Sequence, residues 1–514
     1  MKSGGVVSED LIKILAEHCR DSSLMVRKLM VGSLTELVKA YPEDEMVVRH
    51  WVDGVFPLIL DVEAKAAERV HECVWEQLFG NIVSYADARL NRHFLPWKIL
   101  KYSERLKMTK YLSRACSAWV KDGQLKAPVY NVIKSHVNTE NGNAAWLLFS
   151  LVTPHLPLSD PHFVMDYFNT SIHTPEGVGL YTLLQVLRVL FSSVIRLSRE
   201  EQKLLQKDLV LLISRFAIPP ELISTAVDIA TVVSSIESGQ ENNAGRQHQS
   251  NIDGWAVDII ERIDGELTDK ILKPTGDIEV ENSRMMRQVF TLGELAQICP
   301  HRINKRLFLL MQSIIFQQGT KHRRKKTQTQ QQQPPPEEES HIPGSQTQTT
   351  QPPQCAFTPT TRLQALSIVT LAKMCIQHEE MAKKIVPAFG RLLDTSADIA
   401  IKNNIMYALS DMCVRYASLV DPLLPQITAC LRDSSLVVRR TTLVTLIHLL
   451  QEDYLKMSGR GAFFFRIVQA LLDESDEIRH LTTFYLQQRL LKRKPKIIYH
   501  HFIESLFHYN EYEV

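Results

Sequence analysis

The sequence predicts an all-α solenoid of roughly 11 helix-pair repeats, interrupted by a disordered polar insert. Three observations support this fold class. Residues 423–450 carry two apolar stripes with helical spacing, separated by a short turn. A pattern of Asp followed five and six residues later by Val or Ile and by Arg recurs about every 40 residues, the period of HEAT and armadillo repeats. Glycine is scarce, at 20 of 514 residues, which favours long helices.

The clearest repeat lies between residues 423 and 450. The apolar residues of its two helices are Leu423, Leu424, Ile427, Cys430 and Leu431, then Leu436, Leu443, Leu446, Ile447 and Leu450. Asp433 lies between the two helices, and Arg439 follows one to two turns into the second. An Asp carboxylate can accept backbone N–H groups that have no partner within a helix. We therefore expect Asp433 to form a turn or a helix N-cap.

The same pattern recurs at both ends of the chain. The motif RDSSLxVR occurs at residues 20–27 and 432–439, and degenerate copies in register begin at Asp61 and Asp394. In the Asp394 copy Ala400 replaces the Arg and Lys402 lies nearby. We predict that such pairs bridge adjacent repeats as a structural ladder. Its members are Asp21, Arg27, Asp433, Arg439, Asp473 and Arg479. Exposed ion pairs contribute only about 0–1 kcal/mol each, so the ladder is expected to set register more than stability.

The chain is predicted to contain three parts: helix-pair repeats at 1–317, the insert at 318–358, and further repeats at 359–514. The insert is rich in Gln, Pro and Thr and too poor in apolar residues to fold. Ser198 and Glu201 have the spacing of a capping box at a helix start. Residues 238–251 are polar and predict a surface loop, and residues 497–509 predict a last aromatic helix with a packed core face.

Composition and motifs argue against several classes. The net charge of +2 predicts no partner by itself, so any nucleic-acid contact must come from local patches. The eight cysteines form no CxxC pair, as expected for buried thiols in a reducing compartment. Neither a signal peptide nor 18 consecutive apolar residues is evident, so no membrane association is expected. Phosphate-loop, nucleophile-elbow and zinc-protease motifs are missing, so we expect no enzyme, no cofactor, no metal site and no small-molecule substrate.

Two basic clusters are candidate binding sites. The first lies in the insert and comprises Lys321, Arg323, Arg324, Lys325 and Lys326. It is either a nuclear-import signal, a phosphate contact or a solvated charge run balanced by the Glu residues at 337–339. The second comprises Arg489, Lys492, Arg493, Lys494 and Lys496. Pro495 places it at a helix junction, where it either contacts phosphates or is simply solvated. Thr358, before Pro359, is a candidate for proline-directed phosphorylation.

Residues 359–510 carry more than a generic repeat. The segment NNIMYALSDM at 403–412, the turn RDSSLVVRRT, the loop KMSGRG at 456–461 and the run 478–490 resemble the core domain of the D-type HEAT-repeat subunits of condensin. The likeness is closer to the condensin II member, partly because the Gln/Thr/Pro insert precedes PTTRLQAL. The first 316 residues match mainly as helical repeats. Family members are far longer, so we expect an internal fragment or a short isoform.

The resemblance implies a non-catalytic regulatory subunit. Members of that family bind the kleisin subunit and engage the SMC ATPase subunits, contact chromatin through DNA or histone tails, and act in the nucleus on mitotic chromosomes. The alternative is a HEAT-repeat nuclear transport receptor or another solenoid adaptor protein. A transport receptor is expected to be acidic, which the net charge of +2 does not favour.

Overall fold

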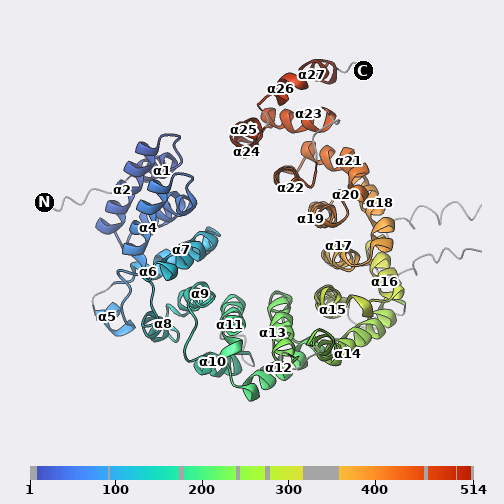
Figure 1. The fold of residues 1–514 in the computed structure, drawn as a ribbon, viewed down its shortest axis with the longest axis horizontal. Helices are drawn as coiled ribbons and strands as arrows, with labels where there is room; N and C mark the ends of the chain where they lie inside the picture. Colours follow the sequence, from blue (N-terminus) through green and yellow to red (C-terminus); the bar gives the residue numbers. More distant parts are fainter. Residues whose placement is uncertain are drawn as a thin grey trace, which may run out of the picture. The chain divides into compact units, whose positions relative to one another are not determined.

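The structure is a computed structural model that describes residues 8–90, 93–172, 179–238, 244–272, 278–316, 358–455, 461–493 and 495–510. Every regular element in these ranges is helical, which confirms the all-α HEAT-type solenoid (Figure 1). The chain divides into two compact units. Unit 1 comprises Met1–Leu209 and Asp228–Ile236, and unit 2 comprises Val210–Val227 and Glu237–Val514. Of the predicted insert, only Thr358 lies within the described residues.

Unit 1 is built from helices that mostly bury one face. Its helices are α1 (Glu9–His18), α2 (Leu24–Ala40), α3 (Glu45–Val55), α4 (Ala64–Leu78), α5 (Tyr85–Leu90), α6 (Leu95–Arg105), α7 (Thr109–Lys121), α8 (Val129–His136), α9 (Gly142–Val152), α10 (His162–Ile172) and α11 (Leu180–Ser193). Helix α9 is buried along nearly its whole length, including Trp146 and Phe149, as its apolar sequence predicts. The helices α12 (Arg199–Ser214) and α13 (Pro220–Ser238) contribute residues to both units.

Unit 2 contains the clearest repeats. Its helices are α14 (Ala244–Leu272), α15 (Ile278–Ile298), α16 (Lys305–Ile315), α17 (Thr361–Ile376), α18 (Glu379–Thr395), α19 (Ile399–Arg415), α20 (Ala417–Val420), α21 (Leu424–Ala429), α22 (Leu436–Gln451), α23 (Gly461–Gln469), α24 (Asp476–Phe484), α25 (Leu491–Arg493), α26 (Ile497–His500) and α27 (Phe502–Tyr509). A π-helical segment at Tyr485–Leu490 joins α24 to α25.

The second helix of each pair packs on the second helix of the next pair. Helices α15, α17, α19, α22 and α24 follow one another in this way and form the second-helix layer of unit 2 (Figure 1). Polar contacts cross the layer. Asn404 on α19 donates to the carbonyl oxygen of Ala365 on α17 at 2.7 Å, and Lys373 on α17 pairs with Glu294 on α15 at 2.7 Å. Each repeat thus depends on its neighbours for its core, as in other solenoids.

The helix start predicted at Ser198 is confirmed, whereas two predicted segments are wrong. Ser198 and Glu201 form the predicted capping box, because each side chain accepts the other residue's backbone N–H, at 3.3 and 2.9 Å. The loop predicted for residues 238–251 is wrong from Ala244 on, where α14 begins. The single helix predicted for residues 497–509 is broken at His501 into α26 and α27.

Candidate functional site: the ladder and the basic segment

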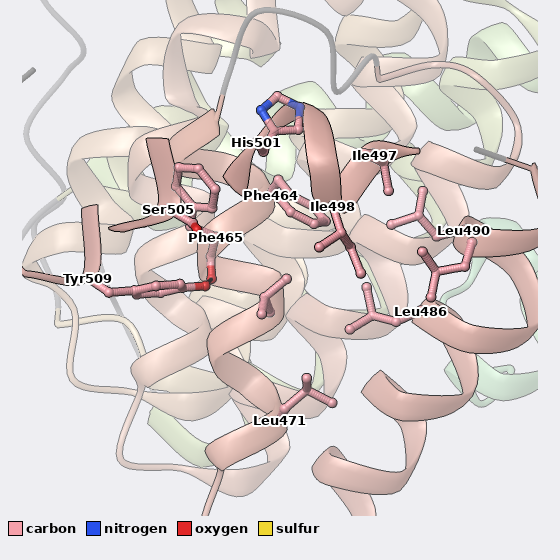
Figure 2. Close-up of a pocket in the computed structure, with 12 residues that line it drawn as sticks. Phe464, Phe465, Leu471, Leu486, Leu490, Ile497, Ile498, His501, Ser505 and Tyr509 are labelled. Carbon is pink, nitrogen blue, oxygen red and sulfur yellow. Dashed lines mark hydrogen bonds between the residues drawn. The ribbon is translucent and has the colours of Figure 1, made fainter. Parts of the chain in front are cut away.

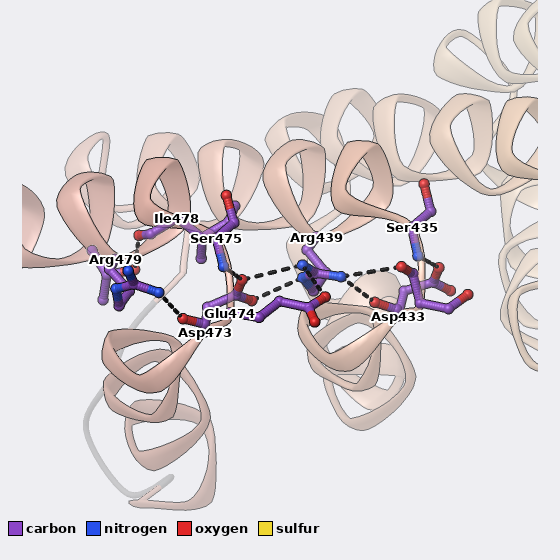
Figure 3. Close-up of polar contacts among 10 residues, drawn as sticks. Asp433, Ser435, Arg439, Asp473, Glu474, Ser475, Ile478 and Arg479 are labelled. Carbon is purple, nitrogen blue, oxygen red and sulfur yellow. Dashed lines mark hydrogen bonds and ion pairs between the residues drawn. The ribbon is translucent and has the colours of Figure 1, made fainter.

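The turns before α2, α4, α22 and α24 are each closed by an Asp carboxylate. Asp433 Oδ1 accepts the backbone N–H of Ser435 at 2.9 Å, and Asp473 Oδ1 accepts that of Ser475 at 2.8 Å (Figure 3). Asp21 and Asp61 bond the residue two positions on in the same way, at 2.7 and 2.8 Å. In each case the helix begins at the third residue after the Asp. The carboxylate therefore closes an Asx turn rather than capping the helix itself.

The ladder arginine joins its own turn to the turn of the next repeat. Arg439 Nη1 donates to the carbonyl oxygens of Asp433 and Ser434, at 2.9 and 3.2 Å. Its Nε lies 2.8 Å from Oδ2 of Asp473, and its Nη2 donates to Oδ1 of Asp473 at 3.1 Å (Figure 3). One side chain thus holds together the turns of two successive repeats.

The same arrangement recurs in unit 1. Arg27 Nη1 donates to the carbonyl oxygens of Asp21 and Ser22, at 3.0 and 3.1 Å. Its Nε lies 2.8 Å from Oδ2 of Asp61, and its Nη2 donates to Oδ1 at 3.1 Å. The two copies of RDSSLxVR therefore fold into the same set of contacts, each directed from the motif's last Arg to the Asp of the following turn.

These ion pairs are withdrawn from water. The side chains of Arg439 and Asp473 are 6% and 7% exposed, and those of Arg27 and Asp61 are 12% and 5% exposed. Burial lowers the pKa of Arg439, but the hydrogen bonds and charges of Asp473 and Glu474 together outweigh burial, so the pKa is raised overall. A buried pair is strongly destabilised when one partner is removed, because the other charge is left without compensation. The expectation that these contacts are weak surface pairs therefore does not fit their burial.

A third rung of the ladder is made by a lysine. Lys402 Nζ lies 2.5 Å from Asp433 Oδ2, and it is the fourth residue of α19, as Arg439 is of α22. Burial raises the pKa of Asp433, but the hydrogen bonds from Lys402 and the Ser435 N–H and the charges of Lys402 and Arg439 together lower it overall. The prediction that this copy of the repeat pattern begins at Asp394 is wrong. Asp398 caps α19 instead, by accepting from the N–H groups of Ala400 and Ile401. Counting from the helix start would have identified Lys402.

The last predicted ladder residue has a different set of contacts. Arg479 Nη1 donates to the carbonyl oxygen of Asp473 at 2.5 Å, which repeats the contact within the turn. Its Nη2 pairs with Asp476 of the same helix. Arg440, beside the ladder, points outward and pairs with Glu477 at 2.5 Å, with both side chains more than half exposed.

The second basic cluster lies at the junction after α24. Arg489, Lys492, Arg493 and Lys496 are all exposed. Arg493 pairs with Asp453. Lys494 lies outside the described residues, as do the five basic residues of the insert, at 321 and 323–326. Thr358 is exposed and in an irregular segment, and Thr360 caps α17 by accepting the N–H of Leu363 at 3.3 Å.

Next to this cluster, an apolar pocket of about 160 Å³ opens between α23 and the last two helices (Figure 2). Its lining includes Phe464, Phe465, Leu486, Ile497 and Tyr509. The core packing predicted for the aromatic residues of this segment is wrong. Tyr499, Phe502 and Phe507 are 82%, 54% and 41% exposed.

No group of metal-ligating side chains occurs in the described part of the chain. Its seven cysteines are free and buried. Burial raises the pKa of the Cys116 and Cys375 thiols to about 12, so both stay protonated near neutral pH. Among the described helices, none is long and apolar enough to cross a bilayer.

Family models match three stretches of the chain. Residues 282–393 match the HEAT repeats of proteins like condensin-2 complex subunit D3, and residues 400–513 match non-SMC mitotic condensation complex subunit 1. Residues 4–31 match a HEAT repeat associated with sister chromatid cohesion.

Curated relatives match nearly the whole chain. The chain is 32% identical to condensin-2 complex subunit D3 of Mus musculus over 99% of its length, and 30% identical to subunit D3-L of Xenopus laevis over 98%. The match covers 33% of each relative, so the chain spans about a third of their length.

Two solved structures share the fold. A C-terminal fragment of the cohesin loader SCC2 from Chaetomium thermophilum has a TM-score of 0.63 at 10% identity, over 97% of this chain and 36% of that one. The S. pombe condensin Cnd3–Cnd2 subcomplex has a TM-score of 0.59 at 12% identity, over 94% and 56%. The helix-pair fold, the family models and the relatives that match nearly the whole of this chain agree. The chain belongs to the D3 HEAT-repeat family of condensin-2 subunits.

Proposed function

We propose that the chain is a non-catalytic HEAT-repeat scaffold of condensin II, which binds the kleisin and SMC ATPase subunits and contacts chromatin to promote mitotic chromosome condensation. The observation that carries this proposal is the 32% identity to the Mus musculus condensin-2 D3 subunit over 99% of the chain. The proposed location is the nucleus and, in mitosis, the chromosomes.

The ladder supports a scaffold role on physical grounds. An extended protein partner needs binding positions that stay in register over several repeats. Lys402, Arg439 and their partners Asp433 and Asp473 fix three consecutive second helices relative to one another. The ladder residues are thus proposed as structural residues that hold the binding surface, and not as contacts to a partner.

The basic segment at 489–496 is the proposed chromatin contact within the described residues. Arg489, Lys492 and Lys496 are exposed at a helix junction. Such side chains contact phosphates without reading sequence, and binding then falls steeply with salt. The basic residues of the insert are proposed to serve the same contact or nuclear import, and Thr358 is proposed as a phosphorylation site.

A pull-down from mitotic extract tests the scaffold function. The tagged chain is incubated with extract, and bound proteins are identified by mass spectrometry. We expect recovery of the condensin II kleisin and SMC subunits. A variant with both Arg439→Ala and Lys402→Ala is expected to recover less, because the register of the second-helix layer is lost.

Failure to recover any condensin subunit with a chain that is helical by circular dichroism would contradict the scaffold function for this stretch. Recovery of transport factors in their place would support the alternative of a transport receptor.

A further inference from the structure

Three exposed apolar side chains occupy the same position on three consecutive second helices. Tyr407, Val444 and Phe484 are each the ninth residue of their helix, α19, α22 and α24, and each is the fifth residue after the ladder cation of that helix. Their exposed fractions are 57%, 46% and 53%. We call these three residues the apolar row.

The ladder places the members of the apolar row side by side. Helices α19 and α22 pack on each other, as do α22 and α24. The ion pair between Lys402 and Asp433 and that between Arg439 and Asp473 fix the starts of these helices. Residues at equal distances from those starts therefore form a line across the layer. Val437 and Val414, 53% and 45% exposed, widen the line on α22 and α19.

The first repeats of the chain lack this feature. The ninth residue of α2 is Gly32, which has no side chain and faces open space, since a Cβ added there would have no atom within 4 Å. The ninth residue of α4 is Glu72. Single exposed apolar side chains are common on protein surfaces, but a contiguous set in register marks an interaction site. The apolar row thus belongs to unit 2 alone among the described repeats with an Asp–Arg turn.

The polar residues beside the row limit what can bind. One turn before each member lie Asn403, Arg440 and His480, which offer an amide, a guanidinium and an imidazole. Arg440 and its partner Glu477 are both more than half exposed. An extended peptide presents backbone carbonyl groups along its edge, and these accept hydrogen bonds from such donors. Arg440 is paired with Glu477, but the exposed cations Arg489 and Lys492 of the basic segment follow Phe484 in the chain and favour acidic side chains between the apolar ones.

We propose that the apolar row is a docking surface for an extended peptide of a protein partner, with an apolar residue at every third position and acidic residues between them. Packed helices lie about 8–10 Å apart, and a peptide in the extended polyproline II conformation advances about 3.1 Å per residue with three residues per turn, so about three residues separate contacts with successive helices. Every third peptide side chain therefore faces a member of the row. This inference deepens the proposed scaffold function and rests on it.

Fluorescence anisotropy with purified full chain tests the docking surface without any condensin subunit. The probe is a fluorescein-labelled dodecapeptide with Leu at every third position and Asp and Ser between them. A second peptide has the same composition in scrambled order. The test variant combines Val444→Asn and Phe484→Asn, both at exposed positions. The control variant is Leu472→Asn, 87% exposed before α24 and outside the row.

We expect at least tenfold weaker binding of the patterned peptide by the test variant, twofold or less change with the control, and at least tenfold weaker binding of the scrambled peptide. Equal binding of both peptides, equal binding by wild type and test variant, or no binding of the patterned peptide would each overturn the proposal. Displacement of the peptide by duplex DNA at equal concentration would assign the surface to nucleic acid and overturn it as well.

The two proposals fail in different ways. If the test variant recovers the condensin II kleisin from extract as well as wild type does, the docking surface is wrong and the scaffold function stands. If wild type binds the patterned peptide but recovers no condensin subunit, the scaffold function is wrong. The natural peptide for the docking surface then belongs to a protein outside condensin II.

Discussion

Replacing Asp473 by Asn removes one charge from a rung of the ladder and leaves the shape of the side chain unchanged. The Asp473 carboxylate is 7% exposed and faces Arg439, which is 6% exposed. Removal of one partner of a buried ion pair destabilises a protein by about 3–5 kcal/mol. The amide oxygen of the new side chain still accepts the N–H of Ser475, and Glu474 lies 2.9 Å from Arg439 Nη2 and compensates part of its charge. We therefore expect the lower end, about 3 kcal/mol.

A matched control separates this effect from a general loss of charge. Glu477→Gln removes the carboxylate that pairs with Arg440, where the two side chains are 52% and 59% exposed. Exposed pairs contribute about 0–1 kcal/mol. Asp473→Asn and Glu477→Gln each remove one negative charge, at positions four residues apart. The difference between their effects on stability therefore measures the contribution of burial.

Hydrogen exchange is the suitable assay, because a repeat array need not unfold in one step. A loss of about 3 kcal/mol accelerates exchange through local opening of α22 and α24 by about a hundredfold. Glu477→Gln is expected to change it by less than about fivefold. Equal protection in the two variants would refute the reasoning. In addition, the pair Arg439→Met with Asp473→Leu is expected to be more stable than either single variant, because it leaves no buried charge.

Three further outcomes follow from the structure. Gly54→Ala is expected to destabilise unit 1 by about 1–3 kcal/mol because its Cβ would lie 3.1 Å from the Cα atom of Ala16, whereas Gly32→Ala, in open space within a helix, is expected to stabilise it by about 0.5–1 kcal/mol; urea unfolding of both variants checks this. Burial raises the pKa of Asp253, but hydrogen bonds from Gln249, His301, Arg302 and Cys299 outweigh burial and lower this pKa to about 2. Since this pKa is lowered, the contribution of Asp253 to stability is fully present above about pH 4 and is lost as the pH falls toward 2. After allowance for screening by water it amounts to about 1–2 kcal/mol, and Asp253→Asn should flatten this part of an acid-unfolding curve. If the basic segment contacts DNA, replacement of Arg489, Lys492 and Lys496 by Ala should reduce the slope of log Kobs against log salt by up to about 3, whereas an unchanged slope would exclude these residues as phosphate contacts.

Much of the fold is local information and was predictable. The apolar stripes, the capping box of Ser198 and the turn around Asp433 depend on residues within one or two helical turns. The ladder residues were also predictable from their spacing. Their partners were not, because Arg439 reaches Asp473 only once two repeats have stacked. The position of Lys402 in the pattern was hidden because the turn before α19 carries Ser396, and no Asp, at the place that Asp433 has before α22.

Solvent exposure was the least predictable property. Apolar residues at helical spacing predict a buried face, but the pattern does not reveal which faces receive a partner. Tyr407, Val444 and Tyr499 have the chemistry of core residues and are exposed. A single sequence shows the period of a stripe and not the elements packed against it, so the apolar row required the structure.

The position of the ladder at the turns gives the repeats of unit 2 an unequal resistance to bending. The rungs join the starts of α19, α22 and α24, while the far ends of these helices have no equivalent series of buried pairs within the described residues. A bend that separates the turns must break charged contacts away from water. A bend that fans out the opposite ends mainly slides apolar side chains past one another. The layer therefore behaves as a hinge with one tethered edge, which opens along the free edge and holds its spacing along the other.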